Sequence, residues 1–294
     1  MATPGDNEPS AGPSPPRLPG ALPPSGPDAA GTSFLEVPGT PPATRADGGR
    51  WFLYGLLGFC AGEVAAYLLV LVAAALAGQS DQLQRIAGLA EPPEWYVGMS
   101  LVGIWFGFWF GPWLASRVRG TGRLVADLGV RFRPVDLVGV VIGVGAQFAV
   151  DLAYAPFISN PSKFGAPTQK LTGAAHGGGF LVIALMTVVG APFFEELFFR
   201  GLLLRAMTRM FTPVALGPSA RRTAGVVGAV AADGLLFGLA HAEWAQFAGL
   251  AAFGMLLAVI AYRTGRLGMN MVSHASFNLV AVVAVAGSRG GLVH

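Results

Sequence analysis

The chain has 294 residues, of which 53% are hydrophobic and only 12% are charged, with a formal net charge of +3. Soluble domains carry about 25% charged residues, so too little polar surface is present to cover a globule in water, and the composition indicates a protein that faces lipid. The small charge, with its basic residues in loops between apolar segments, argues against nucleic acid as a partner. The single cysteine, Cys60, excludes an intramolecular disulfide and a cysteine-based metal site.

The first 50 residues differ from the rest of the chain. They hold 12 of the 22 prolines and no apolar stretch of the kind found in a cleavable signal peptide. Such a segment buries too little to offset the entropy lost on ordering, so we expect residues 1–50 to form a disordered, solvated Pro/Gly-rich tail. Recruitment of partner proteins through its prolines is the alternative.

Seven apolar segments of spanning length follow, and they predict an all-α, polytopic transmembrane helix bundle over residues 51–290. The segments are 51–77, 95–115, 136–157, 179–200, 224–242, 246–262 and 267–286. Glycines within them are expected where helices approach closely; these are Gly139, Gly143, Gly145, Gly249 and Gly254. Aromatic residues near the segment ends are expected at the membrane interface; these are Trp51, Trp95, Tyr96, Trp113, Trp244 and Tyr262.

Arginines cluster in alternate loops and predict the orientation in a cell membrane. The enriched loops contain Arg117, Arg119, Arg123, Arg131 and Arg133, then Arg205, Arg209, Arg221 and Arg222, then Arg263 and Arg266. The positive-inside rule places these loops and the N-terminus in the cytoplasm and the C-terminus outside.

Ionisable groups inside a span are costly, so each needs a partner or a function. In the sequence EELFFR, Glu196 and Arg200 are four residues apart and are expected to pair on one helix face. Glu195 points about 100° away and is left free to act as a general base. The alternative is that both carboxylates only bind arginines between helices.

Two further segments contain histidine within predicted spans. Phe237 lies one turn before His241, and His274 lies one turn before Asn278 on a shared helix face. Alone, each is equally consistent with polar contacts between helices. Together with the glutamates, they supply the groups needed to activate water and to stabilise an oxyanion, and they are also plausible zinc ligands.

These motifs resemble the CPBP family of intramembrane proteases, which includes the CAAX prenyl endopeptidases. That family carries EExxxR, FxxxH and HxxxN motifs on successive helices, here Glu195–Arg200, Phe237–His241 and His274–Asn278. The stretch of residues 262–267 is also similar, and the resemblance covers about 179–285.

The resemblance implies an endopeptidase in which Glu195 and His241 activate a water, and His274 and Asn278 hold the carbonyl oxygen. Glu196 and Arg200 would support the site by pairing. Both a metal-independent glutamate mechanism and a metalloprotease mechanism remain open. Any metal, most plausibly zinc, would be held by Glu195, His241 and His274.

The expected substrate is a peptide bond of a membrane-associated peptide or protein, CAAX-type or other, reached from the membrane plane or the cytoplasmic leaflet. The alternatives are a proton-coupled transporter and a non-proteolytic membrane scaffold. No motif includes Glu63, Asp151 or Asp233; the first two are interpreted as interhelical hydrogen bonders, and Asp233 as an indirect support for His241.

The depths of Glu195, His241 and His274 do not coincide for straight spans of about 20 residues. We therefore expect the fourth helix to continue to about Arg209, and a short turn at 242–246 to join the next two helices.

Overall fold

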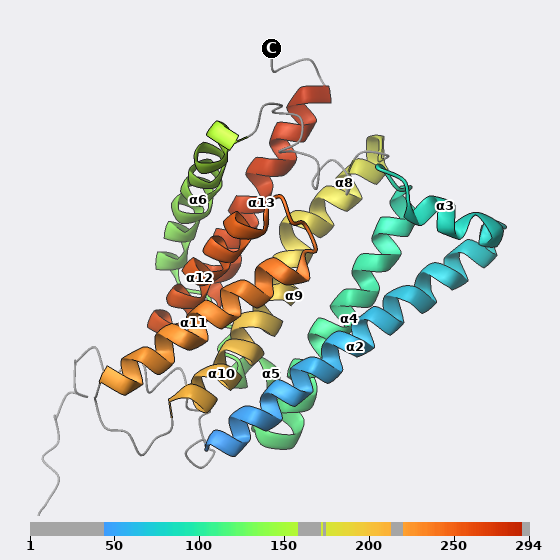
Figure 1. The fold of residues 1–294 in the computed structure, drawn as a ribbon. Coiled ribbons are helices and arrows are strands. Elements are labelled where there is room, and N and C mark those ends of the chain that lie inside the picture. Colours follow the sequence, from blue (N-terminus) through green and yellow to red (C-terminus); the bar gives the residue numbers. More distant parts are fainter. Residues whose placement is uncertain (1–43, 158–171, 173–174, 213–219, 290–294) are drawn as a thin grey trace, which may run out of the picture.

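The computed structural model describes residues 44–157, 172, 175–212 and 220–289, and these form a bundle of long helices (Figure 1). The principal helices are α2 (Arg45–Leu76), α4 (Glu94–Arg119), α6 (Val138–Tyr154), α8 (Gly177–Leu185), α9 (Ala191–Glu196), α10 (Leu204–Phe211), α11 (Ala220–Ala240), α12 (Phe247–Thr264) and α13 (Gly268–Arg289). Shorter ones, α3 (Leu83–Ala87) and α5 (Leu124–Asp127), lie in connections. Seven helices among the described residues are long and apolar enough to cross a membrane, which confirms the predicted bundle.

The first helix begins six residues before the predicted span. Thr44 caps it: its hydroxyl accepts a hydrogen bond from the Asp47 backbone N–H, and the Asp47 carboxylate accepts one from the Thr44 N–H. This reciprocal arrangement satisfies backbone donors that a helix start would leave unpaired. The expectation of a disordered segment is therefore wrong for residues 45–50, and the rest of the predicted tail, 1–43, lies outside the described residues.

The fourth span is one long helix from Gly177 to Phe211, built from α8, α9 and α10 with two π-helical segments between them, η5 (Met186–Gly190) and η6 (Leu197–Leu203). Its continuation past Arg209 confirms the expected extension. The turn between α11 and α12 is also confirmed, because α11 ends at Ala240 and α12 starts at Phe247.

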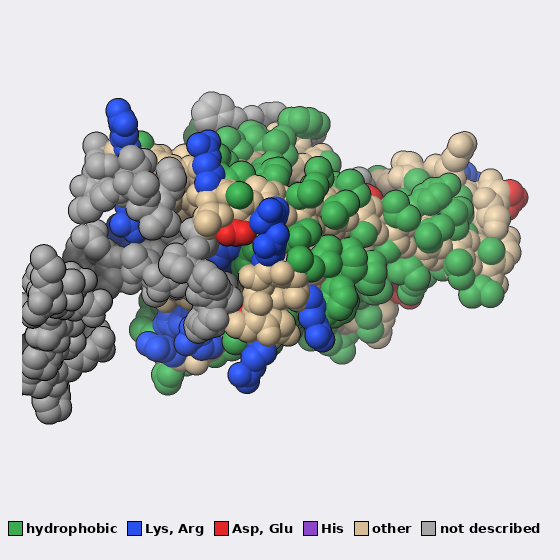
Figure 2. All heavy atoms as spheres, turned by 90° about the horizontal axis from the view of Figure 1, so that it is seen from below, with side chains coloured by type: hydrophobic (Ala, Val, Ile, Leu, Met, Phe, Trp, Pro, Cys, Tyr) green, Lys and Arg blue, Asp and Glu red, His purple; other side chains and the backbone are tan. Residues whose placement is uncertain are grey.

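Two sets of helices pack around this long helix (Figure 1). On one side α2 packs along α4, and on the other α11 packs on α12 and α6 on α13. The main hydrophobic core includes Phe198, Leu202, Phe237, Leu257 and Phe277. Figure 2, which views the molecule from below, shows Lys and Arg side chains gathered toward one side and hydrophobic side chains over much of the remaining face.

Glycines set the closest helix contacts, but not all at the predicted positions. Gly143 approaches the Ser273 backbone of α13, and Gly254 approaches Gly234 and Phe237 of α11, as expected. Gly145 has no heavy atom within 4 Å of where a Cβ would stand, so the expectation for it is wrong. It points out of the bundle because it is two residues, about 200°, from Gly143 around the helix.

Trp51 also departs from its predicted interfacial role. Its ring is 1% exposed and lies under the guanidinium of Arg209, with 4.0 Å from the Arg209 Cζ to the ring centroid. This contact belongs to the packing of α2 on α10. By contrast, Trp244 is 79% exposed.

Candidate active site

Glu195 and Glu196 lie at the end of α9, between the two π-helical segments. Pro192 is the second residue of α9, where it cannot donate a backbone hydrogen bond and its ring crowds the carbonyl four residues earlier. The wider η5 turn precedes it and accommodates this disruption. Insertions of this kind occur often at functional sites, and here they flank the acidic pair on both sides.

Glu196 is the centre of a buried polar cluster. Its Oε1 accepts hydrogen bonds from Arg200 Nη1 and from His274 Nδ1, both at 2.9 Å. Its Oε2 accepts one from the Asn270 amide at 3.3 Å. Glu196 and Arg200 are both 0% exposed, so the predicted pair exists and is removed from solvent.

Arg200 has two further partners in other helices. Its Nη2 donates to the Gly254 carbonyl of α12 at 3.0 Å, and its Nε lies 3.3 Å from Asp233 Oδ2 of α11. The expected support of His241 by Asp233 is wrong in its partner, because this carboxylate faces the arginine instead. The arginine therefore ties α11 and α12 to the helix that carries both glutamates.

His241 directly follows α11, and its ring is held on both sides. Its Nδ1 lies 2.8 Å from the Phe237 carbonyl, which can only accept, so Nδ1 carries the proton and Nε2 is free. The Phe237 ring packs against the imidazole with 4.6 Å between centroids. Burial lowers the pKa of His241 from its ordinary value, more than the bond to the Phe237 carbonyl raises it, which favours the neutral ring.

Three side chains converge at one oxygen. Glu195 Oε2 lies 3.9 Å from His241 Nε2 and 3.8 Å from His274 Nε2. Both distances exceed a direct hydrogen bond of about 2.7–3.2 Å, and they suit a water molecule placed between these atoms. Within the described residues this Oε2 is buried and has no hydrogen-bond partner, as a group awaiting a water or substrate would be.

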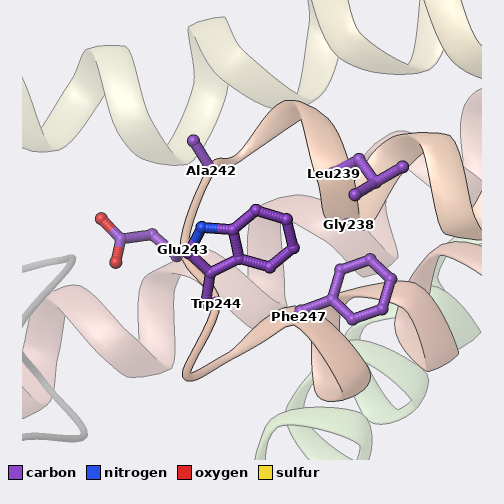
Figure 3. Close-up of a pocket in the computed structure, with 6 residues that line it drawn as sticks. All are labelled: Gly238, Leu239, Ala242, Glu243, Trp244 and Phe247. Atoms are coloured by element: carbon purple, nitrogen blue, oxygen red, sulfur yellow. The ribbon is translucent and has the colours of Figure 1, made fainter.

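The site is open mainly beside His241. The side chain of His241 is 30% exposed, that of Glu195 is 16% exposed, and that of His274 is 3% exposed. A small, open pocket lies at the turn after His241, lined by Gly238, Leu239, Ala242, Glu243, Trp244 and Phe247. Figure 3 shows the rings of Trp244 and Phe247 on the two arms of this turn.

Asn278 lies one turn beyond His274 on α13. Its side-chain amide donates to the Thr187 carbonyl in η5 at 2.9 Å. The π-helical turn thereby gains a partner for one of its backbone carbonyls. An amide nitrogen carries two hydrogens, so one remains for the oxyanion contact, which stays a prediction.

The predicted metal ligands are Glu195, His241 and His274. Carboxylate and imidazole donors suit zinc, and each histidine has its other ring nitrogen bonded to an oxygen, as metal ligands usually do. Nevertheless, the described part of the chain contains no group of three or more His, Cys, Asp or Glu residues that could hold a metal ion as arranged. The metal ligand set therefore stays a prediction.

Sequence reasoning missed Asn270, whose amide joins Glu196 to the Leu257 carbonyl at 2.7 Å. It is four residues before His274, so the helical spacing that linked His274 to Asn278 would also have found it. Glu63 is exposed on α2, and Asp151 accepts a hydrogen bond from Gln147 of its own helix at 2.8 Å.

Residues 177–280 match the protein family described as type II CAAX prenyl endopeptidase Rce1-like. No curated protein and no solved structure matches the chain at a significant level. The matched range contains every residue of the three motifs, and the resemblance to the CPBP family is confirmed. With seven helices able to span a membrane among the described residues, the chain is a multi-pass membrane protein, and the match to this family supports an intramembrane protease in general.

Proposed function

We propose that this protein is an intramembrane endopeptidase in which Glu195 and His241 activate a water against the peptide bond of a membrane-associated substrate. The observation that carries the proposal is the convergence of His241 and His274 on Glu195 Oε2 at 3.9 and 3.8 Å. A carboxylate and a neutral imidazole are both competent general bases at this distance when one water lies between them.

The water would attack the carbonyl carbon while Glu195 takes one of its protons, assisted by the free Nε2 of His241. The new C–O bond gives a tetrahedral intermediate whose oxyanion is held by the second amide hydrogen of Asn278 and by His274. His274 donates from Nε2 only as an imidazolium, since its Nδ1 proton is bound to Glu196. The C–N bond then breaks, and the proton on Glu195 moves to the leaving nitrogen.

The cluster behind the site would hold these groups in place. Glu196 accepts from His274 and Arg200 at once, so its negative charge is compensated by the arginine and still favours a charged His274. A buried carboxylate without the arginine would be far more costly. We favour the glutamate mechanism, in which Glu195 and His241 act on the water directly, and metal analysis distinguishes it from the metalloprotease alternative.

Access beside His241 favours a substrate that arrives from the membrane. Large apolar side chains are exposed around the opening, with Leu239 47% and Trp244 79% exposed. A CAAX-type or other lipid-associated peptide fits such surroundings, and the family match supports that class. We expect the arginine-rich loops and the N-terminus to face the cytoplasm of a cell membrane.

The test is cleavage by the purified full chain in liposomes, measured on quenched-fluorescence peptides with and without a prenylated CAAX end. Glu195→Gln should lower kcat by about 10²–10⁴-fold, the contribution of a general base. The matched control is Glu63→Gln, because Glu63 is exposed on α2 within a spanning helix. Equal cleavage by folded Glu195→Gln and wild type would refute the site.

Two other functions give different results in the same liposomes. A proton-coupled transporter would move protons without cutting any peptide, and a scaffold would do neither. A folded wild-type protein that cleaves neither prenylated nor unmodified peptides would contradict the proposal.

A further inference from the structure

Asp233 is a wholly buried carboxylate that no motif of the sequence includes. It is 0% exposed and lies in the middle of α11. It precedes Phe237 by four residues and His241 by eight, so the three side chains follow one face of the helix. This face is turned toward the active site, since the Phe237 ring contacts both His241 and His274, with 4.6 and 5.5 Å between ring centroids.

The partner of Asp233 is Arg200, and the guanidinium is held along three directions. Nη1 donates to Glu196, Nη2 to the Gly254 carbonyl, and Nε lies 3.3 Å from Asp233 Oδ2. The Arg200 Cζ also lies 4.4 Å from the centroid of the Phe237 ring. Two hydrogen bonds and one ion pair hold the planar guanidinium, so Asp233 helps to fix the direction in which Nη1 points.

The guanidinium of Arg200 is connected through one shared oxygen to His274, a proposed catalytic residue. Arg200 and His274 share the same oxygen, Glu196 Oε1, each at 2.9 Å. Because that oxygen fixes the proton of His274 on Nδ1, it leaves the His274 Nε2 directed at Glu195. A rotation of the guanidinium would displace Glu196 and release the imidazole.

We infer that Asp233 is a positioning residue, which keeps the Nδ1 proton of His274 on Glu196 and sets the orientation of the ring through Arg200 and Glu196. It does not touch the reacting atoms. For catalysis the inference rests on the proposed function, but the effect on the His274 ring does not. Loss of such an outer partner typically costs about 10- to 100-fold in activity.

A buried ion pair that only stabilises the fold would behave differently, and the chain offers a matched control. Asp136 is also an aspartate, 1% exposed, and it pairs with Arg266 at 2.6 Å. Asp136→Asn should lower stability without changing kcat per folded molecule. Asp233→Ala removes the carboxylate beside Arg200 Nε, whereas Asp233→Asn keeps a polar oxygen of the same size there and should restore part of the activity.

The experiment compares these variants as full chains in detergent and in liposomes. The first measurement is the ¹⁵N spectrum of the histidine rings, with His274 assigned from its loss in His274→Gln. We expect the wild type and Asp136→Asn to show one His274 Nδ1 signal with a proton hydrogen-bonded to a carboxylate, and Asp233→Ala to show that signal shifted or split. An unchanged His274 spectrum in folded Asp233→Ala would overturn the inference, whether or not any peptide is cleaved.

The second measurement is peptide cleavage below the unfolding temperature of every variant. Asp233→Ala should lower kcat about 10- to 100-fold with KM little changed, and Asp233→Asn should lie between it and the wild type. An equal loss in Asp136→Asn would mean that both pairs act through stability alone, which contradicts the inference. If the wild type cleaves nothing, the proposed function fails and the ¹⁵N spectrum alone decides the role of Asp233.

Discussion

Substituting Gly107 by alanine tests the packing of α2 on α4. A Cβ at Gly107 would lie 2.2 Å from the Gly58 carbonyl oxygen and 2.5 Å from the Gly62 Cα. Carbon atoms in contact are normally about 3.5–4.0 Å apart, so the helices would have to separate by more than about 1 Å. Both obstructing atoms belong to backbone, which no side-chain rotation can move aside. Overpacking of this kind costs about 1–3 kcal/mol, and more where neither helix can shift.

The control is Gly98→Ala in the same helix, where nothing lies within 4 Å of the added Cβ. That change should stabilise the helix by up to about 1 kcal/mol, because alanine is the better helix former. Thermal unfolding of both variants in detergent gives the comparison. Gly107→Ala should also lower cleavage, since the adjacent Phe108 stacks on Phe198 of the helix that carries the glutamates, with 4.4 Å between ring centroids. Equal unfolding temperatures for the two variants would refute the close contact of α2 and α4.

Three further outcomes are expected. Arg200→Met should destabilise the protein by about 3–5 kcal/mol, because it leaves Glu196 and Asp233 buried without a cation. Adding Glu196→Gln and Asp233→Asn to this variant should recover part of the unfolding temperature, and no recovery would contradict the charge argument. Asn278→Ala should lower the free energy of unfolding by about 1 kcal/mol, because it removes the hydrogen bond to the Thr187 carbonyl. A loss of kcat at unchanged KM in the same variant would indicate the oxyanion contact, whereas an unchanged kcat would exclude it. Removal of metal with a zinc chelator, verified by elemental analysis, should leave the rate of peptide cleavage unchanged. A loss of cleavage that added zinc restores would favour the metalloprotease alternative.

The sequence was sufficient for contacts that follow from the period of a single helix. The pairing of Glu196 with Arg200 was predicted from their four-residue spacing and is confirmed at 2.9 Å. The placing of His241 near Glu195 needed the family motifs as well, since helical spacing says nothing about which helices face each other. The two side chains are 3.9 Å apart, and their shared role in one active site stays a proposal.

Contacts between helices without a motif were not predictable in this way. Asp233 was assigned to His241 because it precedes this residue by two helical turns, yet its carboxylate faces Arg200 on a different helix. The second role of Asn278, as a donor to η5, was also missed because it depends on a π-helical turn. Hydropathy does not reveal such a turn, and Pro192 was the one local signal of it.

The three side chains proposed to act at the site lie at very different positions along their helices. Glu195 is near the middle of a helix of 35 residues, His241 follows the last residue of α11, and His274 is in the second turn of α13. A straight helix of this length measures about 50 Å, against about 30 Å of hydrocarbon, so it must tilt or protrude. Because helices adjust their tilt to the thickness of the surrounding lipid, acyl chains of the wrong length would slide His241 relative to His274. The cleavage rate should therefore pass through an optimum as acyl-chain length is varied, with the lipid itself acting on the geometry of catalysis.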